Sequence, residues 1–97
     1  MPKAYWITAY RKISDPDRLV AYAKLAPLAI APFGGRYLVR GTPAAAFEAG
    51  LKERIVISEF PSMERAIAAY NSRAYKEALQ VLGDAEVRDI RIIEGLE

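Results

Sequence analysis

Turn and helix-cap signals lie directly beside strand and helix patterns at three places in this sequence, and they constrain its fold more than any other feature. Residues 34–41 join a glycine pair to a strand pattern. Residues 57–62 run from a strand pattern through a proline to Ser62, a natural helix cap. Residues 69–75 interrupt one helical pattern, and Ser72 is placed to cap the next. Together these signals set the order of elements in the middle of the chain.

The first third of the chain predicts a strand followed by a helix. Residues 3–12 are rich in aromatic and β-branched side chains, which favour a strand. Asp15 is placed to cap a helix, Pro16 suits the first helical position, and Asp17 suits the positive end of the helix dipole. Pro27 lies inside the helical pattern, so we expect a kink there or a helix split in two.

Three more strands and a second helical region complete the pattern. Residues 35–41 and 53–60 predict strands, joined by a long connection over residues 42–52. Apolar residues then recur at helical spacing, with a break at Asn71 and Ser72. Residues 87–94 alternate around two isoleucines and predict the last strand.

The element order is therefore β-α-β-β-α-β, the split arrangement of ferredoxin-like α+β folds. We expect one domain over residues 1–97, because a chain of 97 residues has the length of a single domain. The predicted sheet has four antiparallel strands in the order 4-1-3-2. Both helical regions lie on one face, which leaves the other face open.

The composition excludes several kinds of chemistry. The chain contains no cysteine and no histidine, so disulfides, thiolates, histidine acid–base catalysis and the commonest metal ligand are all absent. Carboxylates and tyrosines remain as proton-transfer groups, and we expect no metal and no cofactor. The net charge of +2 is too small to indicate nucleic acid, although nine of the fourteen Lys and Arg residues are arginine, the better binder of carboxylate or phosphate.

No apolar stretch approaches the length of a membrane span, since the longest, residues 25–33, contains two prolines. No secretory leader is evident at the N-terminus. We therefore expect a cytoplasmic protein with no membrane partner.

Alternation along the strands separates the two faces of the sheet. We assign the more apolar set to the helix-covered core, namely Tyr5, Ile7, Ala9, Tyr37, Val39, Ile55, Ile57 and Glu59. The mixed set is then expected on the open face: Trp6, Thr8, Tyr10, Arg36, Leu38, Arg40, Val56, Ser58 and Phe60.

The mixed set supports two interpretations that do not exclude each other. Trp, Tyr and Arg are enriched at dimer interfaces, which favours a homodimer joined through this face. The same residues suit a pocket for a small anionic or aromatic ligand, with arginine as the charge partner. The ligand-binding candidates are Trp6, Arg36, Arg40 and Ser58.

The catalytic candidates are Glu59 and Tyr10. Glu59 lies beside a strand end and a helix cap, where it is either a general base with a raised pKa or a partner for a nearby arginine or for backbone donors. Tyrosines could donate protons or hydrogen bonds, but at strand or helix spacing they are more often amphipathic core residues. This alternative applies to Tyr10, Tyr37, Tyr70 and Tyr75 alike.

The same topology occurs in RNA-binding modules, which stack bases on closely spaced aromatic residues of the central strands. Residues 54–60 lack that spacing, so we expect no nucleic-acid partner.

These segments resemble the bacterial domain of unknown function 1330 family, within the dimeric alpha-beta barrel superfamily. The resemblance covers almost the whole chain and rests on residues 5–7, Asp15 with Pro16, residues 34–41, residues 59–62 and residues 70–75. It implies a ferredoxin-like protomer whose open sheet face packs against a second copy. The superfamily includes cofactor-free monooxygenases, isomerases and heme enzymes, but this branch has no settled activity.

Two hypotheses for function remain. The first is a cofactor-independent enzyme or binder of an anionic or carbonyl-containing small molecule. Arg36 and Arg40 would hold the ligand oxygen, and Glu59 or a tyrosine would handle a proton. The alternative is a non-catalytic dimeric module that senses a ligand or serves a structural role.

Overall fold

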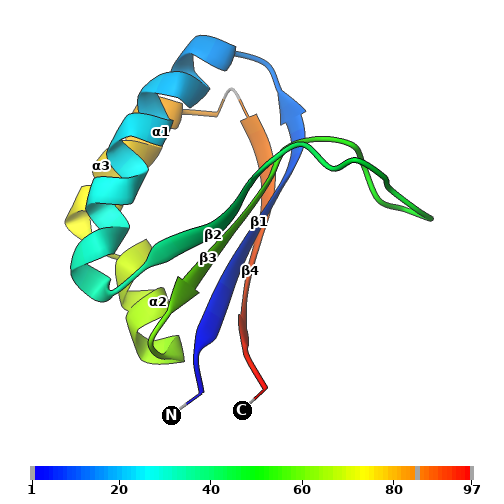
Figure 1. Cartoon of the computed structure of the whole chain (residues 1–97). Helices are drawn as coiled ribbons and strands as arrows, with labels where there is room; N and C mark the ends of the chain where they lie inside the picture. Colours follow the sequence, from blue (N-terminus) through cyan, green and yellow to red (C-terminus); the bar gives the residue numbers. More distant parts are fainter. Residues whose placement is uncertain (1, 85, 97) are drawn as a thin grey trace.

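The computed structural model describes residues 2–84 and 86–96 and confirms the predicted element order. Four strands, β1 (Ala4–Ile13), β2 (Arg36–Gly41), β3 (Ile55–Phe60) and β4 (Glu86–Glu94), form one antiparallel sheet in the order β2-β3-β1-β4. The helices α1 (Pro16–Ile30), α2 (Met63–Tyr70) and α3 (Arg73–Leu82) cover one face of the sheet (Figure 1). A short 3₁₀ turn, η1 (Ala31–Phe33), follows α1. The fold is α+β and ferredoxin-like, and its sheet is open.

The helices begin where the cap residues predict. The Asp15 carboxylate accepts hydrogen bonds from the backbone N–H groups of Asp17 and Arg18, at 3.1 and 3.2 Å. The helix α1 runs through Pro27 without splitting, although this proline cannot donate a hydrogen bond to the preceding turn. Of the two alternatives expected at Pro27, a kink or a split, the split does not occur.

The chain turns tightly between the first helical region and β2. Gly34 has φ +80°, the left-handed conformation that glycine adopts at little cost. A Cβ on Gly35 would lie 2.5 Å from Cε2 of Phe60, so only glycine lets the chain pass over that ring. This close packing fixes the start of β2 against the core.

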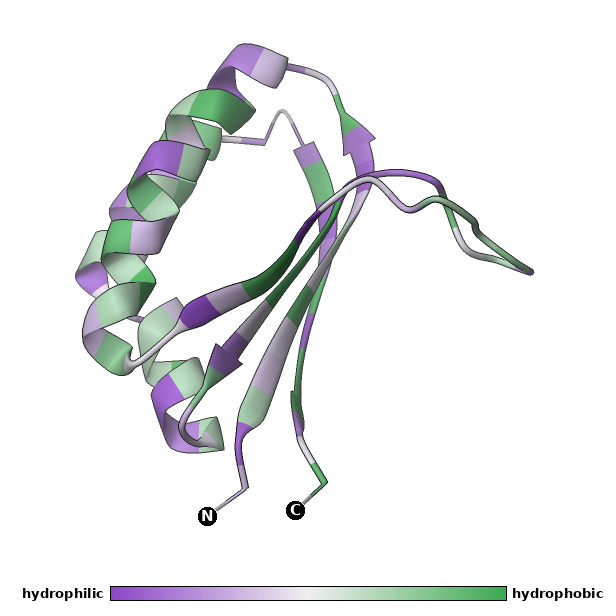
Figure 2. Ribbon diagram, in the orientation of Figure 1, coloured by the Kyte–Doolittle hydropathy of each residue, from purple (hydrophilic) through white to green (hydrophobic). Residues whose placement is uncertain are grey.

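The core lies between the helices and the sheet, and large aromatic side chains fill it. The ring of Trp6 stacks on Phe60 with centroids 5.7 Å apart and meets Tyr75 edge-on at 5.0 Å. Trp6 is 3% exposed and Phe60 is 1% exposed. Hydrophobic residues alternate with more polar ones along the strands, as Figure 2 shows.

The assignment of the two sheet faces is wrong. The helices cover the mixed set, because Trp6, Thr8, Tyr10, Val56, Ser58 and Phe60 are all buried against them. The open face carries the other set: Tyr5, Ile7, Ala9, Ile55, Ile57 and Glu59. The physical reason is size, since the wide gap between sheet and helices needs the bulky aromatic rings.

A bulge also breaks the alternation in β2. The pairing of β2 with β3 shifts between Tyr37 and Val39, so Tyr37 pairs with Ser58, and Arg40 pairs with Val56. Tyr37 and Arg40 therefore lie on the helix side together, although they are three residues apart. Arg36 lies on the open side, away from Trp6, contrary to expectation.

Residues 42–54 form a long connection between β2 and β3 that projects away from the helices (Figure 1). Its base adjoins the ends of both strands. Phe47 in this connection is 81% exposed.

Candidate functional site

A cavity lies between α1, α3 and the helix-covered face of the sheet. The cavity volume is about 30 Å³. The cavity is lined by Trp6, Thr8, Tyr10, Leu19, Tyr22, Ala23, Ala26, Ile30, Tyr37, Arg40, Arg54, Val56, Ser58, Tyr75 and Arg88. In this conformation it accommodates a few small atoms, and a larger ligand would extend through the mouth or displace α1.

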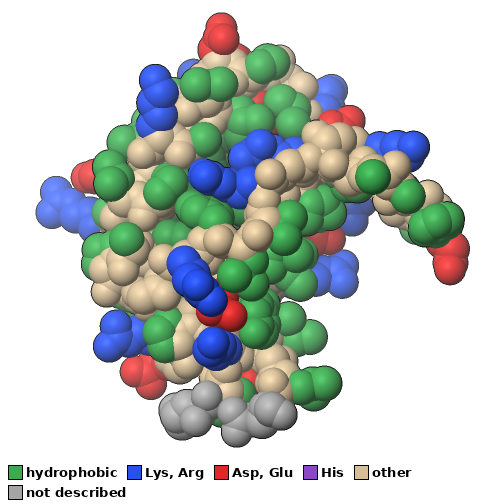
Figure 3. All heavy atoms as spheres, in the orientation of Figure 1, with side chains coloured by type: hydrophobic (Ala, Val, Ile, Leu, Met, Phe, Trp, Pro, Cys, Tyr) green, Lys and Arg blue, Asp and Glu red, His purple; other side chains and the backbone are tan. Residues whose placement is uncertain are grey.

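The lining contains three arginines and no acidic residue. Arg40, Arg54 and Arg88 form no ion pair with any carboxylate in the part of the chain that the structure describes. Blue side chains gather over the gap between the helices and the sheet edge in Figure 3. The cavity therefore has a strongly positive environment and is rich in hydrogen-bond donors.

Arg88 joins two tyrosines at one end of the cavity. Its Nη1 donates to the Tyr22 hydroxyl at 3.0 Å, and its Nη2 donates to the Tyr75 hydroxyl at 3.4 Å. The two hydroxyls also form a hydrogen bond with each other. The guanidinium carbon lies 5.0 Å from the ring centre of Tyr22 and 5.6 Å from that of Tyr10, within range of cation–π attraction.

Burial sets the protonation state of these phenols. It raises the pKa of Tyr22 and that of Tyr75 above the ordinary value of 10.0, and it outweighs the opposing effect of the Arg88 charge on both. Both hydroxyls therefore keep their protons at neutral pH, so the pair donates hydrogen bonds and does not act as a base.

The opposite end of the cavity is formed by β2 and β3. The Arg40 guanidinium lies 4.6 Å from the ring centre of Tyr37. Burial, together with the nearby tyrosines, raises the pKa of Tyr37 to about 12 despite the charges of Arg40 and Arg54. This end also offers donors and no base.

Two buried donors in the lining have no hydrogen-bond acceptor among the described residues. They are Nε1 of Trp6 and Nε of Arg54. An unpaired buried donor costs about 1–3 kcal/mol, so a water or a ligand acceptor in the cavity would stabilise the protein.

The structure brings together four of the six predicted site residues. Trp6, Tyr10, Arg40 and Ser58 all line the cavity. Arg36 and Glu59 lie on the open face of the sheet, where Nε of Arg36 donates to Oε1 of Glu59 at 2.9 Å.

Glu59 is thus paired with Arg36, and a partner of this kind was one of the two roles expected for this carboxylate. Its side chain is 12% exposed, and Lys3 Nζ lies 3.7 Å from the same oxygen. The hydrogen bond from Arg36, with the charges of Arg36 and Lys3, lowers the pKa of this carboxyl below its usual value of 4.5. A lowered pKa is the opposite of what a general base at neutral pH needs.

Arg88, Arg54 and Tyr22 were not identified as site residues from the sequence. Arg88 lies on β4, whose faces alternation alone did not distinguish. Its register partner Tyr10 was recognised, so the pairing of β1 with β4 is the information that would have found it.

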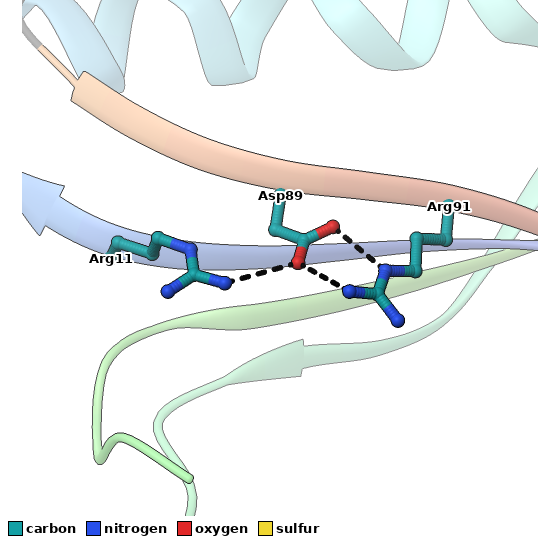
Figure 4. Close-up of polar contacts among 3 residues, drawn as sticks. All are labelled: Arg11, Asp89 and Arg91. Carbon is teal, nitrogen blue, oxygen red and sulfur yellow. Dashed lines mark hydrogen bonds and ion pairs between the residues drawn. The ribbon is translucent and has the colours of Figure 1, made fainter. Parts of the chain in front are cut away.

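A second charged cluster lies on the open face. Asp89 accepts hydrogen bonds from Arg11 at 3.3 Å and from Nε and Nη2 of Arg91 at 3.1 and 3.2 Å (Figure 4). Arg91, with Arg11, lowers the pKa of Asp89. This cluster lies outside the cavity lining, and its two arginines share one carboxylate.

Within residues 2–84 and 86–96, no group of three or more acidic residues is arranged to hold a metal ion. The same residues include no helix that is long and apolar enough to cross a membrane.

Comparison with protein families gives a match over residues 3–96 to a family described as Domain of unknown function (DUF1330). The chain belongs to the DUF1330 family. A comparison of the sequence with curated proteins gives no match.

Several solved structures share this DUF1330 fold. The protein RPA0582 of unknown function from Rhodopseudomonas palustris is 14% identical, with a TM-score of 0.73 over 99% of this chain and 84% of that one. SnoaB, a cofactor-independent oxygenase from Streptomyces nogalater, is 7% identical, with a TM-score of 0.66 over 100% of this chain and 96% of that one. A dimeric ferredoxin-like protein of unknown function from Bacteroides fragilis is 11% identical, with a TM-score of 0.58 over 96% of each chain. At these identities the similarity establishes the fold alone.

Proposed function

We propose that this DUF1330 protein binds a small anionic or carbonyl-containing molecule in the cavity between the helices and the sheet. The observation that supports this most directly is the set of three lining arginines with no carboxylate partner among the residues that the structure describes. Arg54 and Arg88 are half-buried, whereas Arg40 is exposed. A half-buried cation without a counter-charge is costly, and a bound anion would offset that cost.

The lining favours binding and the stabilisation of negative charge over proton abstraction. Arginine, tryptophan and protonated tyrosine donate hydrogen bonds, and the described residues supply no carboxylate or histidine to the lining that could remove a proton. As an enzyme, the protein would stabilise an oxyanion formed on its ligand, without metal or cofactor. The fold similarity to the cofactor-independent oxygenase SnoaB is compatible with that class.

The alternative is a non-catalytic dimeric module that senses a ligand or is structural. The small volume of the cavity, about 30 Å³, favours this alternative. In that case the arginines would serve only to position the helices and strands around the cavity.

We also propose that the protein is a homodimer joined through the open sheet face. That face is apolar at its centre, with Ile7 and Ile57 paired across β1 and β3. On the same face, Val39, which pairs with Ile57, is 47% exposed, and Ile93, which pairs with Tyr5, is 57% exposed. Proteins of this fold from Bacteroides fragilis and Thermobifida fusca are dimeric. A large exposed apolar surface of this kind is typical of an interaction site.

Binding in the cavity is testable through its tryptophan. Trp6 is the single tryptophan of the chain and lines the cavity, so its fluorescence reports occupancy. We expect short carboxylates, such as pentanoate, to change this emission saturably. Arg40→Met should weaken their binding by roughly tenfold or more, because it removes a charge-assisted hydrogen bond.

The matched control is Arg65→Met, which removes an exposed arginine of α2 outside the cavity. This variant should bind as the unaltered protein does. Equal loss in both variants, or no saturable change with any short carboxylate, would contradict the proposal. If short carboxylates bind as expected, mass spectrometry of molecules carried through native purification would identify the natural ligand.

A further inference from the structure

The hydrogen bonds of the cluster formed by Tyr22, Tyr75 and Arg88 leave one hydrogen without an acceptor. Two protonated phenols bring two hydrogens, and only one can lie between their oxygens. Arg88 donates to both oxygens and accepts from neither. The second phenolic hydrogen therefore has no acceptor among the described residues.

The tyrosine that carries this hydrogen lies in the wall of the cavity. Both rings line it, as does Trp6, whose buried Nε1 also lacks an acceptor. Trp6 is 3% exposed and touches the Tyr75 ring edge-on. This end of the cavity therefore presents two hydrogen-bond donors, the second phenolic hydrogen and Nε1 of Trp6, that have no acceptor among the described residues.

The other end of the cavity holds a separate cationic pair. The backbone N–H of Tyr10 donates to the Arg54 carbonyl at 2.9 Å, while Tyr10 pairs with Arg88 on its other side. Arg54 and Arg88 therefore flank β1, and two strand spacings put their Cα atoms about 10 Å apart. Arg40 lies beyond Arg54 on β2, opposite Val56.

We infer that the ligand carries two oxygen-bearing groups: a carboxylate bound by Arg40 and Arg54, and a second acceptor oxygen bound by the free phenolic hydrogen of the Tyr22–Tyr75–Arg88 cluster. This inference rests on the proposed function and narrows its substrate class to short oxo acids or dicarboxylates. The lining also contains apolar side chains such as Ala26 and Ile30, which suit the carbon chain that joins the two groups.

The first part of the test compares acids of equal charge and chain length. Trp6 fluorescence is titrated with pentanoate and with 2-oxopentanoate and 4-oxopentanoate, which add one uncharged acceptor at two positions. We expect at least one oxo acid to bind about 3- to 10-fold more tightly than pentanoate, the gain of one net hydrogen bond. Succinate, glutarate and adipate are then each compared with the monocarboxylate of the same length, which is butanoate, pentanoate or hexanoate. Because each dicarboxylate adds the same charge, the length with the largest gain in affinity gives the preferred separation of the two groups.

The variant Tyr22→Phe/Tyr75→Phe/Arg88→Met replaces the whole polar cluster by apolar groups of similar shape. We expect it to lose the preference for the oxo acid over pentanoate, while pentanoate itself binds more weakly because one of the three lining arginines is removed. Either single tyrosine-to-phenylalanine variant leaves one phenolic hydrogen in place and should keep the preference.

The outcomes separate this inference from the proposed function. If pentanoate and both oxo acids bind equally to the unaltered protein, the inference is overturned while carboxylate binding stands. A preference that survives in the triple variant also overturns it, because another group must then bind the second oxygen. If none of the acids binds, both the inference and the proposed function fail.

Discussion

At the scale of single residues, the ion pair between Glu59 and Arg36 shows how one partner decides a role. The carboxylate of Glu59 faces away from the cavity and accepts from Arg36 at 2.9 Å. Because this bond lowers the folded-state pKa of Glu59, the pair stabilises the fold above the ordinary pKa of the carboxyl. The stabilisation is lost as the pH falls through the lowered value.

This linkage predicts a pH-dependent effect of Glu59→Gln. The variant should have a lower melting temperature than the unaltered protein at pH 7, and the difference should shrink as the pH falls below about 4.5, the usual pKa. Thermal melts by circular dichroism between pH 7 and pH 3 measure it. Glu53→Gln, in the exposed connection before β3, is the control and should show no such trend. A constant difference across this range would contradict the prediction.

In β1 and β3 the sequence could predict which residues share a face, but not which face meets the helices. Trp6, Tyr10 and Ser58 were grouped correctly, since strand geometry alone demands it. The choice between the faces depends on the space under the helices, a property of the packed molecule. Arg40 lines the cavity because of the bulge in β2, which shifts the strand against β3 and turns Arg40 to the helix side. The sequence does not reveal this bulge.

At the scale of elements, the break between α2 and α3 is the feature that local sequence predicts best. Ser72 Oγ accepts from the backbone N–H of Tyr75 at 3.2 Å and donates to the Ala69 carbonyl at 2.7 Å. One side chain thus satisfies groups of both helices at the break. The break also places Tyr75 over the cavity, which links a cap to the candidate site. The course of α1 through Pro27 was less predictable, because tertiary packing offset the lost hydrogen bond.

Removing the Ser72 cap should lower the free energy of unfolding more than removing the Ser62 cap does. Ser72→Ala is expected to lower the free energy of unfolding by about 1–2 kcal/mol, because two hydrogen bonds of a half-buried hydroxyl disappear. Ser62→Ala is the matched control, since its hydroxyl caps α2 with one bond, from Arg65 N–H at 3.2 Å, at an exposed site. Urea denaturation measures both. An equal or larger loss for Ser62→Ala would argue against this role of Ser72.

At the scale of the whole molecule, the two sheet faces have different chemistry and therefore different tasks. The helix-covered face holds the aromatic rings and arginines of the cavity. The open face holds aliphatic residues between two charged clusters, centred on Glu59 at one end and Asp89 at the other. An aliphatic centre with a charged rim is the usual anatomy of a protein interface. This arrangement makes the open face suitable for a second copy of the chain, although different residues supply it from those expected.

The proposed dimer predicts distinct effects for exposed aliphatic residues on the two sides of the molecule. Val39→Lys and Ile93→Lys, on the open face, should each convert the dimer to a folded monomer, because a buried unpaired lysine would oppose association. Leu28→Lys is the control, since Leu28 is 73% exposed on α1, on the helix side. Sedimentation velocity at micromolar concentration gives the oligomeric state, and circular dichroism checks the fold. The proposal fails if the unaltered protein is a monomer, or if Leu28→Lys dissociates the dimer as readily as the open-face variants. If the open-face variants stay dimeric, the two chains meet elsewhere and the aliphatic face needs another partner.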